Sequence, residues 1–262
     1  MTADYKIGVV DLFCGIGGLS HGMYRTGFKI IAGFDIDETC KYAYETNNKA
    51  VFYGQDINTI SKEQINNLFA GYDIKILAGC APCQPFSSYA FKVKDKDDKK
   101  YNLLYQFGRL VKEVLPDIVT MENVSQILSF KQKPVLDDFI STLKQNGYYV
   151  TFKTVFCPDY GIPQTRKRLV LLASRYGTIE LIPPTHSPEN YKTVRAVIGS
   201  LPPIKAGEIC KSDTLHRARS LTELNLKRIK ATPLNGSWRD WPEQLQLQCH
   251  KKTSGKSFGS VY

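Results

Sequence analysis

The first regular pattern in the chain is Lys6-Ile7-Gly8-Val9-Val10-Asp11-Leu12-Phe13, an apolar run that predicts a buried strand. This run leads directly into Cys14-Gly15-Ile16-Gly17-Gly18, and residues 19–26 have the composition of a helix. Glycines placed directly after a strand allow a tight turn and let the backbone approach a ligand closely. The segment therefore predicts a strand, a ligand-binding turn and a helix, although an ordinary structural turn also explains the glycines.

Strand-like and helix-like segments alternate after this turn. Runs typical of strands cover residues 29–34, 74–79, 116–121, 148–156 and 168–173, and helix-like stretches cover residues 38–47, 101–115 and 135–145. Alternation of this kind is typical of a parallel sheet with helices on both faces. The sequence therefore predicts an α/β fold with a doubly wound, mostly parallel sheet.

The character of the sequence changes around Pro183-Pro184-Thr185-His186. Beyond this point Pro, Lys and Arg become more frequent, two tryptophans appear, and the periodicity fades. We therefore expect two domains, with the sheet in residues 1–190 and a small C-terminal lobe in residues 191–262.

The chain has 262 residues and a formal net charge of +10, most of which lies near its end. Residues 181–262 contain 13 Lys and Arg against 6 Asp and Glu, whereas residues 1–180 contain 22 against 19. A basic segment attached to a nearly balanced one suits a lobe that binds a polyanion such as nucleic acid. Lysines that only solvate the surface explain the charge equally well.

The remaining bulk features favour an intracellular protein. The chain has no apolar run of the ~20 residues that a membrane-spanning helix needs, and its N-terminus lacks the pattern of a secretory signal. The seven cysteines are odd in number and scattered through apolar segments, so they do not suggest a disulfide framework. We expect a reducing, cytoplasmic location.

An acidic residue, Asp35, ends the second expected strand, twenty residues after Gly15. A carboxylate at this position can bind the hydroxyl groups of a ribose. The glycines follow the pattern Gly-x-Gly-Gly rather than the Gly-x-Gly-x-x-Gly of dinucleotide sites. A cofactor that contains a nucleoside therefore fits better than a dinucleotide.

Two cysteines follow the expected strand at residues 74–79, in the segment Gly79-Cys80-Ala81-Pro82-Cys83-Gln84-Pro85-Phe86-Ser87. The pair could be redox-active or half of a zinc site, both cysteines could be inert packing, or Cys83 could be a nucleophile at the ligand-binding edge of the sheet. The only loose candidates for further zinc ligands are Cys210, His216, Cys249 and His250. Because they include no tight second pair of the zinc-site type, we expect no metal.

Three motifs resemble, in order and spacing, the signature of the cytosine-C5 DNA methyltransferases. They are Pro82-Cys83-Gln84 after one strand, Glu122-Asn123-Val124 after the next, and Gln164-Thr165-Arg166-Lys167-Arg168 later in the chain. Residues 11–18 look like the cofactor motif of the same family, and the similarity extends over residues 7–205. The resemblance implies the Rossmann-like fold of S-adenosylmethionine-dependent methyltransferases and the modification activity of a restriction–modification system.

The resemblance also implies catalytic roles for Cys83, Glu122, Arg166 and Arg168. Cytosine C5 cannot attack a sulfonium methyl group unaided, and addition of the Cys83 thiolate to C6 makes C5 sufficiently nucleophilic. Glu122 would supply a proton or hydrogen bond to N3 of the ring, which predicts a partly buried carboxyl group with a raised pKa. Arg168 would hold the cytosine O2, and Arg166 would brace the catalytic loop and Glu122.

The cofactor contacts of the family map onto a further set of positions. These are Phe13, Gly15 and Gly17 for methionine and adenosine, Asp35 for the ribose, Ile36, Asp56 and Ile57 for adenine, and Leu104 as a further contact. Ile36 departs from the larger aromatic residue that is often found at its position. We expect this difference to affect the packing of adenine more than its identity.

A cytosine inside a duplex is out of reach of Cys83, so the resemblance implies that the base flips out of the helix. Ser87 and the Lys-rich residues 92–100 are candidates for phosphate contacts, although a solvated loop explains them equally well. In the C-terminal lobe, cations mixed with aromatic side chains make Arg217, Arg228 and Lys251 candidates for contacts with double-stranded DNA.

Family members continue past the position of Tyr262 with more of the recognition region and two further motifs. We therefore expect an incomplete C-terminal lobe, a remainder that a longer chain or a second polypeptide supplies, and poor methylation by residues 1–262 alone. The expected location is bacterial, cytoplasmic and nucleoid-associated. Two other functions remain open, which are a non-catalytic or split-subunit DNA-binding fragment and an RNA cytosine methyltransferase.

Overall fold

A computed structural model describes residues 5–82, 98–129 and 134–248 of the chain. The chain divides into two units, Met1–Val197 and Ile198–Tyr262. Among the helices in these described ranges, none is both long and apolar enough to cross a membrane.

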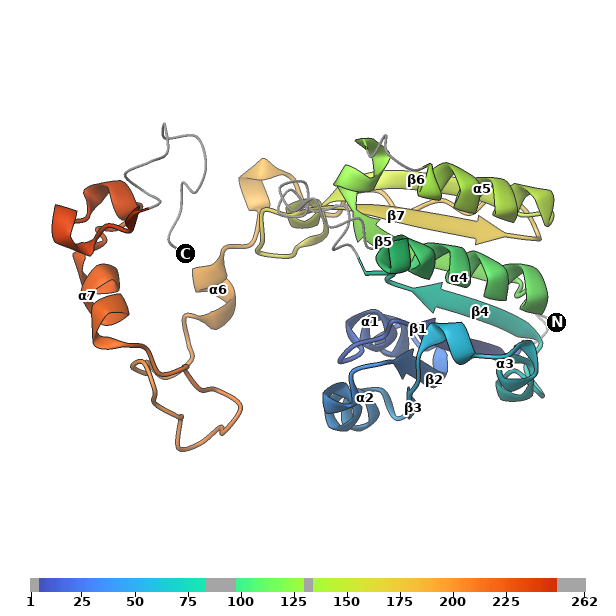
Figure 1. Cartoon of the computed structure of the whole chain (residues 1–262), viewed down its shortest axis with the longest axis horizontal. Helices are drawn as coiled ribbons and strands as arrows, with labels where there is room; N and C mark the ends of the chain where they lie inside the picture. The colour runs from blue at the N-terminus through green and yellow to red at the C-terminus, as the bar shows by residue number, and fades with distance from the viewer. Residues whose placement is uncertain (1–4, 83–97, 130–133, 249–262) are drawn as a thin grey trace. The chain divides into compact units, whose positions relative to one another are not determined.

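The first unit is built on a seven-stranded sheet with the strand order β3-β2-β1-β4-β5-β7-β6 (Figure 1). The strands are β1 (Ile7–Leu12), β2 (Lys29–Asp35), β3 (Val51–Gly54), β4 (Ile74–Gly79), β5 (Ile118–Val124), β6 (Tyr149–Phe156) and β7 (Lys167–Ser174). Strands β1 to β5 pair in parallel, whereas β7 pairs antiparallel with both β5 and β6. The predicted α/β fold with a mostly parallel sheet is therefore confirmed.

The order of the strands reverses beside β1. The chain passes from β1 to β2 and β3 on one side and then returns to β4 on the other side. Open α/β sheets bind ligands in the crevice outside the carboxyl ends of the strands at such a reversal. The ends of β1, β2 and β4 therefore mark the expected position of a site.

Helices cover both faces of the sheet in the first unit. One face carries α1 (Gly18–Arg25) and α2 (Lys41–Asn48). The other face carries α3 (Lys62–Leu68), α4 (Asp98–Val114) and α5 (Val135–Gln145), and α4 and α5 lie side by side (Figure 1). The arrangement is the doubly wound one that the alternation of strands and helices predicts.

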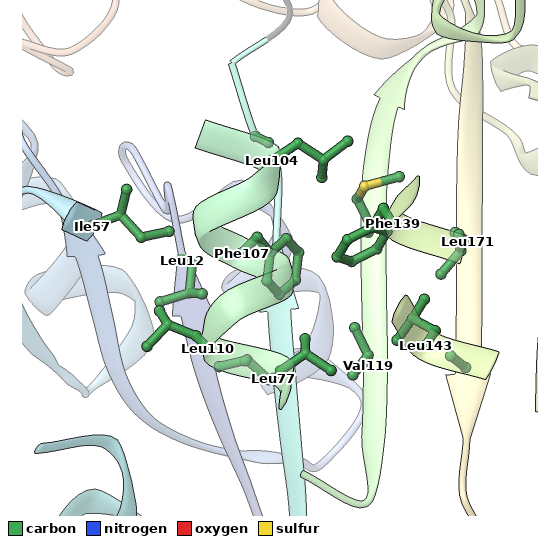
Figure 2. Close-up of a cluster of buried hydrophobic side chains, with 14 of the residues drawn as sticks. Leu12, Ile57, Leu77, Leu104, Phe107, Leu110, Val119, Phe139, Leu143 and Leu171 are labelled. Atoms are coloured by element: carbon green, nitrogen blue, oxygen red, sulfur yellow. The ribbon is translucent and has the colours of Figure 1, made fainter. Parts of the chain in front are cut away.

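The alternation of side chains along β1 builds the core on both faces. Val9 packs with Tyr44 of α2, whereas Val10 and Leu12 belong to the cluster that contains Phe107 of α4 (Figure 2). All five side chains are fully buried, and burial of one such apolar side chain contributes roughly 1.5–3 kcal/mol. The packing on both faces fixes the end of β1, from which the Gly-rich turn starts.

Some elements differ from the sequence prediction. Strand β5 continues to Val124, so Glu122, which is expected directly after the strand, lies within it and opposite Val170 of β7. Pairing with the antiparallel strand β7 explains this extension. Neither β3 nor α3 is predicted from the sequence. Strand β3 has only four residues and its Val51 is half exposed, and helix α3 has only seven residues.

The second unit begins at the last residue of the short helix α6 (Val194–Ile198) and contains α7 (Glu223–Ala231) and the 3-10 helices η8 (Trp238–Asp240) and η9 (Glu243–Leu245). Trp238 and Trp241 are buried. The indole Nε1 of Trp241 donates to Thr232 Oγ1 at 2.7 Å, and the Arg228 guanidinium lies 5.5 Å from the centre of the Trp241 ring. The two tryptophans therefore anchor the packing of this unit.

Candidate active site

A cavity of about 230 Å³ lies at the carboxyl ends of β1, β2, β3 and β4. Its apolar lining comes from Leu12, Phe13, Phe34, Ile36, Ile57, Ile60, Pro82 and Leu103, and its polar lining from Asp35, Gln55, Asp56 and Cys80. An apolar cavity with a few polar groups at a topological switch point is the usual form of a cofactor site. The cavity thus occupies the position that the strand order predicts.

The Gly-rich turn between β1 and α1 uses a left-handed backbone at Phe13 (φ 57°), Gly15 (φ 50°) and Gly17 (φ 88°). At Gly15, no described atom lies within 4 Å of the place that a Cβ would take. At Gly17, an added Cβ would lie only 2.2 Å from Asn48 Nδ2. Gly15 therefore keeps the turn open, whereas Gly17 allows α1 to pack closely on α2.

The carboxylate of Asp35 is oriented by the backbone around it. Its Oδ2 accepts a hydrogen bond from Gly15 N at 2.8 Å, and its Oδ1 accepts one from Asp37 N at 3.0 Å. Gln55 N donates to the backbone oxygen of Asp35 at 3.0 Å, which ties the end of β3 to the same point. A carboxylate offers about four acceptor positions, so Asp35 can still accept hydrogen bonds from a ribose.

A second wall of the cavity is the 3-10 helix η2 (Ile57–Thr59), which Asp56 caps. The Oδ1 of Asp56 accepts hydrogen bonds from Asn58 N at 2.9 Å and Asn58 Nδ2 at 2.7 Å. Ile57 points toward the core beside α4 (Figure 2), whereas Ile36 is 73% exposed. A carboxylate beside two isoleucines suits an apolar purine ring with an exocyclic amino group.

The chemistry of the cavity fits S-adenosylmethionine. Two carboxylates, Asp35 and Asp56, lie among apolar side chains, and the described lining contains no Lys or Arg. A nucleotide phosphate usually binds to cationic side chains or to a helix N-terminus. An acidic and apolar cavity instead favours a nucleoside with no phosphate and with a positive charge, as the sulfonium cofactor has.

Glu122 of β5 and Arg168 of β7 form an ion pair, in which Arg168 Nε lies 2.6 Å from Glu122 Oε1. The Glu122 side chain is 33% exposed and that of Arg168 is 16% exposed. Burial raises the pKa of the Glu122 carboxyl group above its ordinary value, while the charge of Arg166 and a hydrogen bond with Cys80 oppose the rise. A carboxyl group in this setting can hold a proton for transfer.

The backbone that leads toward Cys83 is held from two sides. Cys80 N donates to the last carbonyl of β1 at 3.3 Å, and Asn123 Nδ2 donates to Ala81 O at 3.3 Å. Asn123 is fully buried and directly follows Glu122 in β5. The chain therefore leaves β4 beside the strand that carries Glu122, and Cys83 directly follows the described range that ends at residue 82.

Arg166 lies in a turn one residue before β7. Arg166 N donates to Gln164 O at 2.8 Å, and Cys157 N donates to Arg166 O at 2.8 Å. The charge of Arg166 offsets part of the rise that burial causes in the pKa of Glu122. The structure thus brings Arg166 and Arg168 together around Glu122.

Five of the expected cofactor residues line the cavity, which are Phe13, Asp35, Ile36, Asp56 and Ile57. Gly15 and Gly17 shape the turn and are not in the lining. Leu104 is 3% exposed and belongs to the core, whereas its neighbour Leu103 lines the cavity. Successive residues of a helix point about 100° apart, so the phase of α4 directs only one of this pair toward the cavity.

The expected DNA contacts differ in their surroundings. Arg217 is exposed. Arg228 donates from Nε to Leu245 O at 2.8 Å and from Nη1 to Asn225 Oδ1 at 3.0 Å, so part of its guanidinium serves the packing of its own unit. Ser87 and Lys251 lie outside the described residues, as do Cys249 and His250. In the described ranges, no group of three or more His, Cys, Asp or Glu side chains could hold a metal ion.

The sequence of this chain matches known methylases over most of its length. The model of the C-5 cytosine-specific DNA methylase family matches residues 7–259. The chain is 50% identical over 254 residues to the Type II methylase M.HgiDII of Herpetosiphon aurantiacus, which covers 97% of this chain and 71% of that protein. It is 32% identical over 199 residues to the Type II methyltransferase M.XorII of Xanthomonas oryzae pv. oryzae, covering 74% of this chain and 46% of that protein.

The structure has a matching relative as well. The methyltransferase EhMeth of Entamoeba histolytica superposes with a TM-score of 0.55 at 26% identity, covering 70% of this chain and 58% of that one. The chain thus spans about half the length of two of these relatives. The family match includes the cavity at the ends of β1 to β4 and the Glu122–Arg168 pair. This chain therefore belongs to the C-5 cytosine-specific DNA methylase family.

Proposed function

We propose that this chain carries the cofactor-binding and catalytic parts of a DNA (cytosine-5) methyltransferase that uses S-adenosylmethionine, with Cys83 as the nucleophile. The observation that carries the proposal is the Glu122–Arg168 ion pair, which lies beside the backbone that leads to Cys83. Membership of the family supports the reaction class, and the similarity to Type II methylases supports a modification enzyme of a restriction–modification system. The substrate would be a cytosine within a specific sequence of double-stranded DNA.

S-adenosylmethionine would bind in the cavity at the ends of β1 to β4. Asp35 would accept hydrogen bonds from the ribose hydroxyls, Asp56 would accept one from the adenine amino group, and Ile36 and Ile57 would cover the adenine ring. When bound, the cofactor supplies an electrophilic methyl group attached to a sulfonium ion.

The residues of the chain would activate cytosine by covalent addition. The thiolate of Cys83 forms a bond to C6, and Glu122 gives its proton to N3, so electron density collects on C5. After C5 has gained the methyl group, loss of the C5 proton to solvent breaks the S–C6 bond, and the electron pair returns to sulfur. N3 returns its proton to Glu122, and the ring is again aromatic.

Arg168 can serve both the base and Glu122. Its Nε is paired with Glu122, and its Nη1 donates to the Lys167 carbonyl at 2.8 Å. An arginine has five N–H donors, so further donors remain for the cytosine O2. The same side chain would therefore fix the ring and hold Glu122 in place.

The second unit would add contacts with DNA. Its excess of Lys and Arg supports phosphate binding, and Arg217 is exposed for that purpose. The relatives are longer than this chain, and we infer that their remaining length, in the same or a second polypeptide, completes the recognition region. An enzyme of this kind would work on chromosomal DNA at the nucleoid.

Covalent trapping tests the proposal. Duplex DNA with 5-fluorocytosine in varied contexts would be incubated with S-adenosylmethionine and the complete protein, because fluorine at C5 blocks the final elimination. We expect an adduct that survives denaturation and is lost in Cys83→Ser but kept in the control Cys40→Ser. Adducts on RNA alone would indicate an RNA methyltransferase, and their absence on both nucleic acids would leave only a binding role.

A further inference from the structure

Arg109 of α4 binds the backbone of the wall that contains Asp56 and Ile57. Its Nη2 donates to the carbonyl oxygens of Ile57 and Ile60, each at 3.1 Å. Ile57 and Ile60 both line the cavity, whereas Arg109 is not in the lining. One nitrogen of Arg109 therefore binds the η2 wall from outside the cavity lining.

The rest of the Arg109 guanidinium is fixed by its own helix. Its Nε donates to Gln106 Oε1 at 2.7 Å, and its Nη1 donates to Glu113 Oε2 at 2.9 Å. Gln106 and Glu113 lie one turn before and one turn after Arg109. A planar guanidinium that is held on two edges has little freedom left, so its third edge presents Nη2 in one orientation.

The electrostatics of η2 favour a cation at this place. Carbonyl oxygens near the C-terminal end of a helix carry partial negative charge, and the Ile57 carbonyl, which accepts a hydrogen bond from Ile60 N at 3.3 Å, keeps a second lone pair for Arg109. The side chains of Ile57 and Ile60 are 5% and 2% exposed, so these carbonyls lie at a dry part of the chain. A positively charged donor is therefore well suited to fix their orientation.

The same helix contributes a wall of its own. Leu103, less than two turns before Arg109 on α4, lines the cavity. Arg109 thus joins the wall made by η2 to the wall made by α4. Ile57 of η2 and Leu110 of α4 belong to the same core cluster (Figure 2), but this apolar packing does not set the position of the polar groups of η2.

We propose that Arg109 is a positioning residue for the cofactor, which sets the distance and orientation of Asp56 and Ile57 relative to Leu103. The inference rests on the proposed S-adenosylmethionine site. Because Arg109 acts through η2, its loss should weaken binding of the adenosine part and leave the chemical step unchanged.

The test compares Arg109→Ala and Arg109→Lys in the complete protein by calorimetric titration with S-adenosylmethionine and with adenosine. For Arg109→Ala we expect the Kd of both ligands to rise about tenfold, equivalent to about 1.4 kcal/mol, with kcat unchanged at saturating cofactor. Lysine keeps the charge and can donate to both carbonyls, but it cannot reproduce the planar fork of the guanidinium. The Kd of Arg109→Lys should therefore lie between that of the wild type and that of Arg109→Ala.

Two controls separate positioning from loss of stability. Glu113→Gln removes the charge of the ion pair but keeps an oxygen that can accept from Arg109 Nη1, so the guanidinium stays oriented and the Kd should match that of the wild type. Ile140→Ala removes a half-buried side chain that packs on the same core from α5, so it should lower the Tm without changing the Kd. If Arg109→Ala does not fold, the Kd of Arg109→Lys decides whether Arg109 positions the cofactor site.

The possible results exclude one another. A Kd for the Arg109 variants equal to that of the wild type, or raised no more than in Ile140→Ala, would overturn the role of Arg109. A fall in kcat with an unchanged KM for the cofactor would overturn it as well. A wild-type protein that binds no S-adenosylmethionine would instead contradict the proposed function.

Discussion

Asp11 of β1 is a fully buried carboxyl group beneath the Gly-rich turn. Its Oδ2 accepts a hydrogen bond from Ser20 Oγ at 2.6 Å, and Ser20 Oγ lies 3.0 Å from the hydroxyl of Tyr44. Its Oδ1 has no hydrogen-bond partner among the described residues. Burial raises the pKa of Asp11 to about 6, so the carboxyl group keeps its proton in the folded protein at mildly acidic pH.

This shift in the Asp11 pKa predicts how stability depends on pH. The folded protein holds the proton up to about pH 6, whereas the unfolded chain releases it near the ordinary value of 3.8. The free energy of unfolding should therefore fall by about 3 kcal/mol as pH rises from about 4 to about 6. Urea unfolding of the wild type and Asp11→Asn at pH 4 and pH 7 measures this. Identical pH dependence in the two proteins would contradict the prediction.

Glu122 gives a second prediction at the level of a single residue. Glutamine at this position can form a hydrogen bond but cannot give up a proton, so Glu122→Gln should reduce kcat by roughly 10²-fold or more. Glu122 does not line the cavity, so the Kd for S-adenosylmethionine should stay the same. The wild-type rate should fall as pH rises through the raised pKa of Glu122, and the variant should lack this fall. Single-turnover methylation across pH checks both statements.

The Gly-rich turn joins β1 to α1, and its two positive-φ glycines should respond differently to an added methyl group. Gly17→Ala places a Cβ 2.2 Å from Asn48 Nδ2, so it should lower the free energy of unfolding by roughly 2 kcal/mol or more. Gly15→Ala meets no described atom within 4 Å and should cost about 1 kcal/mol from its backbone alone. Its main effect should be a higher Kd for the cofactor. The measurements are denaturant unfolding of both variants and titration of both with S-adenosylmethionine. If the turn were only structural, the two variants would show equal effects on the free energy of unfolding and on the Kd.

The elements that sequence patterns predict well are those with a strong and local signal. The apolar run before Gly15 and the acidic residue Asp35 identify β1, the turn and the end of β2, and the structure has all three. The four residues of β3 are too few for a clear pattern. The choice between Leu103 and Leu104 depends on the rotation of α4, which two adjacent apolar residues do not reveal.

The sequence does not reveal contacts between segments that lie far apart along the chain. In the sequence, Arg109 looks like any charged residue of an amphipathic helix. In the structure, its hydrogen-bond partners Ile57 and Ile60 lie 52 and 49 positions earlier in the chain. Gln55 lines the cavity, and its side chain exchanges hydrogen bonds with Gln64 of α3, which the pattern does not predict as a helix. Only the folded arrangement shows that these residues belong to the site.

For the whole molecule, the two units divide the proposed work. The first unit contains the cavity and the Glu122–Arg168 pair, so the proposed cofactor binding and proton transfer belong to this unit. The second unit, residues 198–262, carries an excess of six positive charges, with 11 Lys and Arg against 5 Asp and Glu. Methylation should therefore depend on salt mainly through DNA binding, because counterion release accompanies each phosphate contact.

Two arginines of the second unit allow this division to be tested. Arg217 is exposed, so Arg217→Ala should reduce the slope of log Kd against log salt concentration by about 1 while stability stays unchanged. Arg228 donates to Leu245 O and Asn225 Oδ1 and lies over the Trp241 ring, so Arg228→Ala should destabilise the unit by roughly 1–3 kcal/mol. The chain has two tryptophans, and both lie in this unit, so tryptophan fluorescence reports its unfolding. Anisotropy titrations of duplex DNA at several salt concentrations measure the slope. An unchanged slope in Arg217→Ala, or an unfolding transition in Arg228→Ala that matches the wild type, would contradict these separate roles.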